Sequence, residues 1–208
     1  MLVEIWSDVV CPWCYIGKRR FESALARFEH AHEVELLWRS FELDPEAPVR
    51  RGSTAEHLAR KYGWSAEQVA ASHARLESLA AAEGLEYHLD ETQGGNTFDA
   101  HRLLYAARER ARQDELEERF FRAYFTEGEP IGDREALARL AAEVVPEAAE
   151  MLRAGVFADE VRADEPHVLG IHAVPFFVLD RRYGVEGAQP ADVILRALEQ
   201  AWVERAAA

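Results

Sequence analysis

Two cysteines separated by two residues, between a short apolar segment and an amphipathic one, constrain this chain most. Cys11 and Cys14 are the only cysteines among its 208 residues. Residues 2–6 are typical of a short buried strand, and from Pro12 onward apolar residues recur at helical spacing. We therefore predict that a strand leads into a helix with Cys11 at its N-terminus, where the partial positive charge favours a thiolate.

The residues between and beside the cysteines fit this arrangement. Pro12 suits the first helical turn, where its missing N–H is not needed. Cys14 then lies one turn further along, within reach of a disulfide with Cys11, which is typical of thiol–disulfide redox chemistry. We predict that Cys11 is the exposed nucleophile and that Cys14 is buried and resolves the mixed disulfide. Pro12 and Trp13 are candidate substrate-binding residues.

Two other interpretations of the cysteine pair are weaker. A structural zinc site needs two further ligands, and the chain has no second cysteine pair and no suitably spaced histidine pair close to the first. Two inert buried cysteines would need neither a proline between them nor a junction between strand and helix. No metal site is therefore predicted.

Composition argues against several classes of function. The net charge of −14 disfavours nucleic acids and anionic membrane surfaces as partners. No stretch approaches the roughly 20 apolar residues of a membrane span, and the chain does not open with the pattern of a signal peptide. We therefore expect a cytoplasmic protein. A hydrophobic content of 49% is ample for a packed core.

The order of strand and helix patterns predicts an α/β fold. Alternating residues at 34–41 complete a strand–helix–strand unit. Near the end of the chain, apolar residues 175–179, a hairpin partner at 183–187 and a helix after Pro190 form a second unit. Between residues 53 and 165 helical patterns follow one another without a convincing strand. A β-α-β half and a β-β-α half are thus expected to flank a large helical insertion.

Several stretches spread over nearly the whole chain carry a family resemblance: residues 7–17, 41–45, 96–103, 123–125, 174–177 and 187–190. They resemble the DsbA-like thioredoxin family, most closely its FrnE-type subgroup of cytosolic dithiol oxidoreductases. The resemblance implies a thioredoxin fold with a large all-helical insertion. The implied domains are a thioredoxin-like domain of residues 1–52 plus 166–208 and an insertion domain of residues 53–165.

The resemblance also implies further site residues. In this family the proline corresponding to Pro175 follows a cis peptide bond and faces the disulfide, so Pro175 is a candidate catalytic residue and Val174 a substrate-binding one. Asn96 and His101 lie in a segment that approaches the site in related proteins, and Gln189 is a further candidate. His101 is equally compatible with a core or surface histidine, and Gln189 with a turn residue.

The function implied by the resemblance is thiol–disulfide exchange on protein or small thiol substrates, by a monomer or homodimer. Glutathione is a candidate co-substrate, and no other cofactor is expected. The alternatives are a glutathione-dependent isomerase of the 2-hydroxychromene-2-carboxylate type, which typically has serine at the position of Cys11, and a non-catalytic ligand- or metal-binding module. The sequence departs from the subgroup at Ala173, usually glycine, and at residues 166–167, where Pro-His interrupts a helix.

Overall fold

The computed structural model describes residues 1–164 and 170–206, which form two compact units. Unit 1 comprises Met1–Phe41 and Asp164–Ala208, and unit 2 comprises Glu42–Ala163. The first boundary thus lies after Phe41 and not after residue 52, because the chain leaves the sheet directly after its second strand. The predicted boundary between residues 165 and 166, and the Pro-His pair at 166–167, lie outside the described residues.

Unit 1 has a four-stranded sheet with the strand order β2-β1-β5-β6. β1 runs parallel to β2 and antiparallel to β5, which pairs antiparallel with β6. Its elements are β1 (Leu2–Ser7), α1 (Pro12–Leu25), a 3-10 turn (Ala31–Glu33), β2 (Glu35–Ser40), β5 (Phe176–Leu179), β6 (Tyr183–Glu186) and α9 (Ala191–Ala206). This is a thioredoxin fold, so the predicted β-α-β and β-β-α halves are confirmed.

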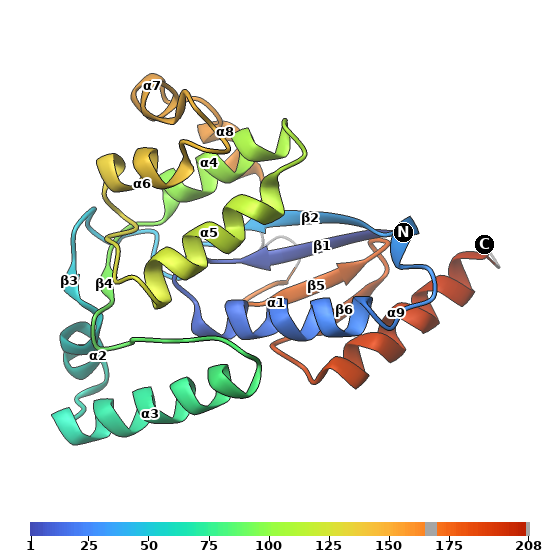
Figure 1. The fold of residues 1–208 in the computed structure, drawn as a ribbon, viewed down its shortest axis with the longest axis horizontal. Coiled ribbons are helices and arrows are strands. Elements are labelled where there is room, and N and C mark those ends of the chain that lie inside the picture. The colour runs from blue at the N-terminus through green and yellow to red at the C-terminus, as the bar shows by residue number, and fades with distance from the viewer. Residues whose placement is uncertain (165–169, 207–208) are drawn as a thin grey trace. The chain divides into compact units, whose positions relative to one another are not determined.

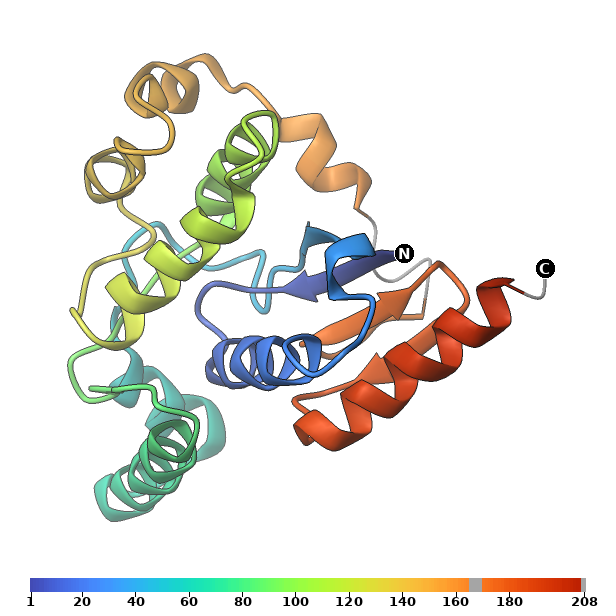
Figure 2. The ribbon, with the colours of Figure 1, turned by 45° about the vertical axis from the view of Figure 1, so that its right-hand side comes forward.

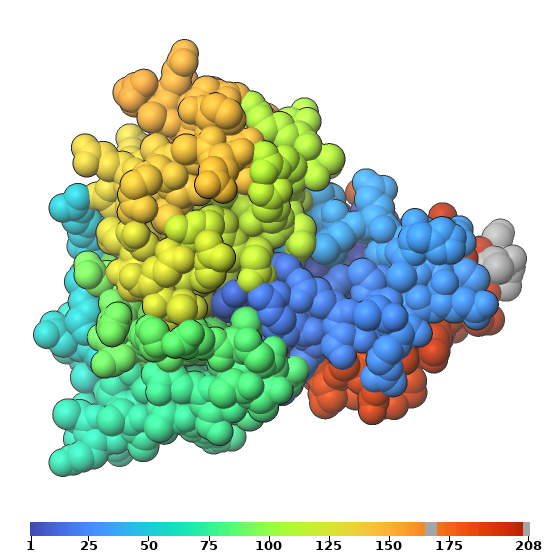
Figure 3. All heavy atoms as spheres, in the orientation of Figure 1, coloured from blue at the N-terminus to red at the C-terminus, as the bar shows by residue number. Residues whose placement is uncertain are grey.

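The hydrophobic core of unit 1 lies between the sheet and two helices. α1 and α9 lie side by side along one face of the sheet (Figures 1 and 2), and their atoms adjoin in the space-filling view (Figure 3). Alternate strand residues point to this face because side chains alternate along a strand. The core includes Val3, Ile5, Trp38, Phe177 and Leu179 of the sheet, Phe21 and Ala24 of α1, Phe28, and Ile194, Leu198 and Ala201 of α9.

The opposite face of the sheet carries a buried ionic cluster. Glu4 Oε1 accepts hydrogen bonds from Arg39 Nε and Nη2 at 3.0 and 2.5 Å, and Glu4 Oε2 accepts one from Arg181 Nε at 3.2 Å. Asp164 accepts from Arg39 Nη1 at 3.1 Å and from the Ser40 N–H at 2.6 Å. The cluster therefore ties the segment before residue 165 to the edge strand β2.

Unit 2 is mainly helical. Its helices are α2 (Thr54–Tyr62), α3 (Ala66–Ala82), α4 (Phe98–Arg108), α5 (Gln113–Phe125), α6 (Arg134–Ala141), α7 (Ala148–Ala154) and α8 (Ala158–Ala163). The expectation that this region lacks strands is wrong in one place, because β3 (Gly52–Ser53) pairs with β4 (Gln93–Gly94). Two residues per strand are too few to give an alternating pattern that sequence inspection recognises.

Two helices of unit 2 begin at residues whose side chains cap them. Ser65 and Gln68 form a capping box at the start of α3, and Asp133 caps α6 through two backbone N–H groups. α5 contributes four aromatic side chains to the core of unit 2, all 0–3% exposed: Phe120, Phe121, Tyr124 and Phe125. Within the described residues no helix is both long and apolar enough to cross a membrane.

Candidate active site

Cys11 occupies the N-cap position of α1, so the predicted start of the helix at Pro12 is confirmed. The Cys11 N–H donates to the Asp8 carbonyl at 2.9 Å, and the Cys11 carbonyl accepts from the Cys14 N–H at 3.0 Å. The first turn contains no acidic residue. The partial positive charge of the helix N-terminus therefore acts on the Cys11 sulfur without a competing carboxylate in that turn.

Both cysteines are free thiols in the structure, and both are buried. Cys11 is 4% exposed and Cys14 is fully buried. The prediction that Cys14 is buried is confirmed, whereas the prediction that Cys11 is exposed is wrong. A physical reason is that the Val174 main chain lies against the Cys11 sulfur, with 3.7 Å between Cys11 Sγ and the Val174 carbonyl oxygen. Trp13, between the cysteines, is 40% exposed.

The environment of Cys14 keeps this thiol protonated. Burial raises the pKa of the Cys14 thiol well above its usual value, and the hydrogen bond and charge of Cys11 raise it further. Hydrogen bonds from the Asp8 backbone and the Ser7 side chain act in the opposite direction and are weaker. Burial together with the neighbouring Cys11 therefore favours the neutral thiol form of Cys14.

The Val174–Pro175 segment enters the site from the other end of the chain. The peptide bond between these residues is cis, as the resemblance implied. β5 begins directly after Pro175 and pairs with β1, with Phe176 opposite Trp6. The C-terminal end of β1 and the start of β5 therefore lie side by side at one end of the strands. This brings Val174 beside Cys11 although they are 163 positions apart.

Gly17 is a residue of this region that sequence reasoning did not single out. A Cβ atom added to Gly17 would lie 2.7 Å from Pro175 Cγ, closer than side-chain carbons approach one another. The missing side chain is thus what allows α1 and Pro175 to touch. A signal was available, because glycine within a helix costs about 1 kcal/mol relative to alanine and usually has a packing reason.

Gln189 lies in the turn between β6 and α9. Its N–H donates to the Gly187 carbonyl at 2.9 Å, and its side-chain Nε2 donates to the Glu186 carbonyl at 2.8 Å. These contacts are those of a turn residue. A role of Gln189 in substrate binding stays a prediction.

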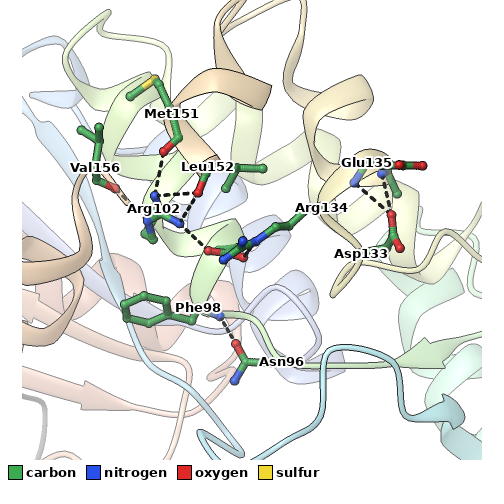
Figure 4. A network of polar contacts seen from close by, with 11 residues as sticks. Asn96, Phe98, Arg102, Asp133, Arg134, Glu135, Met151, Leu152 and Val156 are labelled. Atoms are coloured by element: carbon green, nitrogen blue, oxygen red, sulfur yellow. Dashed lines mark hydrogen bonds and ion pairs between the residues drawn. The ribbon is translucent and has the colours of Figure 1, made fainter. Parts of the chain in front are cut away.

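Asn96 and His101 belong to unit 2. The Asn96 amide donates to the Pro45 carbonyl at 3.1 Å and to Glu42 Oε2 at 3.3 Å, and its oxygen accepts from the Phe98 N–H at 3.0 Å (Figure 4). Burial raises the pKa of Glu42, and the hydrogen bond from Asn96 opposes that shift. Asn96 therefore fastens the segment after β2 to the start of α4. His101 is 2% exposed in α4, and substrate binding by either residue stays a prediction.

A buried arginine fixes α4 within unit 2. Arg102 Nη1 donates to Asp99 Oδ1 at 2.5 Å, and Asp99 Oδ2 accepts from Arg134 Nε at 2.6 Å (Figure 4). Arg102 also donates to main-chain carbonyls at and after the end of α7, those of Met151, Leu152 and Val156. The carbonyls of Met151 and Leu152 belong to the last turn of α7, where intrahelical donors are lacking. Arg102 and Asp99 thus connect α4 to both α6 and α7. Among the described residues, no group of three His, Cys, Asp or Glu side chains is arranged to hold a metal ion.

Comparison with known proteins gives one family and several similar structures. The DSBA-like thioredoxin domain family matches residues 2–199. A probable DsbA oxidoreductase from Streptomyces coelicolor is 48% identical with a TM-score of 0.91, over 98% of this chain and 91% of that chain. The uncharacterized protein YwbO of Bacillus subtilis is 28% identical over 203 residues, 94% of each chain.

Two more distant structures share the fold. The cytosolic disulfide reductase DsbM from Pseudomonas aeruginosa, solved with GSH, is 19% identical with a TM-score of 0.65, over 96% of this chain and 98% of that chain. A 2-hydroxychromene-2-carboxylate isomerase is 17% identical with a TM-score of 0.69, over 99% of this chain and 98% of that chain.

Proposed function

We propose, because the chain belongs to the DsbA-like thioredoxin domain family, that it is a thiol–disulfide oxidoreductase whose reactive pair is Cys11 and Cys14. One observation carries the proposal. Two free thiols lie at the start of α1, and the Cys11 sulfur is 3.7 Å from the Val174 carbonyl. A serine at the position of Cys11 would have favoured the isomerase function. A third metal ligand beside the two cysteines would have favoured a metal-binding function.

Disulfide reduction would proceed in two exchange steps. The Cys11 thiolate attacks one sulfur of a substrate disulfide, the substrate S–S bond breaks, and the other substrate sulfur leaves as a thiolate. Cys14 then loses its proton and attacks the Cys11 sulfur in the mixed disulfide, which forms the Cys11–Cys14 disulfide and releases the second substrate thiolate. The Cys14 proton goes to a departing thiolate. The substrate gains two electrons and the protein loses two, and oxidation of a dithiol runs the same steps in reverse.

The two cysteines divide these roles according to their environments. The raised pKa of Cys14 keeps it a thiol until the mixed disulfide forms, so Cys11 is the sulfur that reacts first. Trp13, which is 40% exposed, and the Val174–Pro175 segment would contact the incoming substrate. We include Pro12, Asn96, His101 and Gln189 as candidate substrate contacts, glutathione as a candidate co-substrate, and a cytoplasmic location.

The test is the reduction of insulin by dithiothreitol, with and without the protein. Wild type should accelerate the reaction, and Cys11→Ser should abolish the acceleration. Cys14→Ser should instead accumulate a mixed disulfide with a substrate, because the resolving thiol is missing. Ser23→Ala changes an exposed residue of α1 and serves as the control that retains wild-type activity.

The other functions give different results in the same experiment. A wild type without dithiol activity that converts 2-hydroxychromene-2-carboxylate in the presence of glutathione would establish the isomerase function. A wild type that does neither and binds a stoichiometric metal or ligand would establish a binding module. Either result would refute the proposal.

A further inference from the structure

Gly17 lies three residues after Cys14 in α1, where it faces Pro175. A Cβ atom at this position would be 2.7 Å from Pro175 Cγ, 3.4 Å from Pro175 Cβ and 3.6 Å from the Cβ atom of Ala188. The first distance requires a displacement of about 0.7 Å to reach the 3.4 Å at which ordinary contact begins. The Pro175 ring cannot swing aside as a long side chain would, since its Cγ belongs to a ring closed on the backbone.

Pro175 is also held by a main-chain hydrogen bond to the turn after β6. Its carbonyl accepts a hydrogen bond from the Gly187 N–H at 2.8 Å. The next residue of this turn, Ala188, accepts one at its carbonyl from Arg20 Nη1 at 2.6 Å. Gly17 and Arg20 lie on the same face of α1, one turn apart, since residues three apart share a helix face. α1 thus contacts both Pro175 and the turn that supports it.

We propose that Gly17 is a positioning residue of the active site, which sets the separation between the start of α1 and the Val174–Pro175 segment. Gly17 does not touch the reacting sulfurs. It acts through Pro175, whose neighbour Val174 lies 3.7 Å from Cys11 Sγ. This inference rests on the proposed thiol–disulfide exchange, because the segment beside Cys11 is where the second sulfur of that reaction would approach.

The size of the expected effect follows from the displacement. A misplacement of about 1 Å at a reacting centre costs about 100-fold in rate. A shift of about 0.7 Å in the Pro175 ring, partly absorbed by its surroundings, should therefore slow the exchange by about 10-fold. The substitution also replaces a glycine in a helix by a better helix former, so a loss of activity would not reflect a weaker helix.

The experiment compares Gly17→Ala and Gly17→Ser with wild type and with the Ser23→Ala control. Three quantities are measured: insulin reduction, the rate of Cys11 alkylation by iodoacetamide from pH 5 to pH 9, and thermal unfolding. We expect folded Gly17 variants with about 10-fold slower insulin reduction and an altered pH profile of alkylation. A structural role alone would lower the unfolding temperature and leave that pH profile unchanged, which would overturn the proposal.

A second variant covers the case in which the Gly17 variants do not fold. Arg20→Met removes the hydrogen bond to the Ala188 carbonyl without adding a clash, and Arg20→Lys restores a donor. Arg20→Met should slow insulin reduction and shift the alkylation profile in the same direction, with recovery in Arg20→Lys. Wild-type rates and profile in folded Arg20→Met would refute the proposal. An inactive wild type would refute the proposed function instead, and the alkylation profiles would still test Gly17.

Discussion

The reduced protein should lose stability in alkaline solution because of Cys14. Burial, and secondarily the hydrogen bond and charge of Cys11, raise the pKa of Cys14 in the folded protein. In the unfolded chain a cysteine has an ordinary pKa of about 8.5. Above that pH the unfolded chain releases the Cys14 proton while the folded protein keeps it, so rising pH favours the unfolded state.

Proton linkage gives the sign and the size of this loss of stability. A group whose pKa is raised on folding contributes stability. This stability is fully present below the pKa of the unfolded state and is lost as the pH rises through the pKa of the folded state. One retained proton gives a slope of at most about 1.4 kcal/mol per pH unit. Raising the pH from about 9 to about 10 should thus cost up to about 1.4 kcal/mol, or roughly 3–6 °C in unfolding temperature for a chain of this length.

The assay is urea unfolding of the reduced protein between pH 7 and pH 10. Cys14→Ser removes the titrating group, so its stability should fall less steeply above pH 8.5, whereas all tyrosines and lysines are common to both proteins and cancel. Cys11→Ser should retain most of the slope, because burial is the largest cause of the shift. Parallel curves for wild type and Cys14→Ser would refute the reasoning. Loss of the slope in Cys11→Ser would show that the Cys11 interaction, and not burial, dominates.

Two stability predictions follow from unit 1. Glu4→Gln should lower the free energy of unfolding by about 3 kcal/mol. This is at the low end for a broken buried ion pair, because Arg39 keeps Asp164 as a partner. Urea unfolding measures the change, and a value below about 0.5 kcal/mol would contradict the prediction. Leu198→Ala removes a fully buried side chain of α9 and should cost about 2–5 kcal/mol. Val203→Ala, on the same helix but 68% exposed, should change stability by less than about 0.5 kcal/mol, and equal effects of the two would refute the packing of α9.

The sequence predicts those features that depend on local patterns. The start of α1 follows from an apolar strand that ends before Pro12, and the hairpin of β5 and β6 follows from apolar segments on either side of Asp180–Arg182. Both are signals within a few residues of one another. The burial of Cys11 was not predictable in this way, since it depends on Val174, which lies 163 positions away. The contact between Gly17 and Pro175 is non-local in the same sense.

The pairing of β1 with β5 explains how distant segments make one site. Two antiparallel neighbours place the end of one strand beside the start of the other, so Cys11, after β1, and Val174, before β5, meet whatever the chain does between them. Both strands are also fixed from the core side, through Ile5 and Phe177. The site therefore requires the β1–β5 register and the α1–Pro175 contact, which both lie within unit 1.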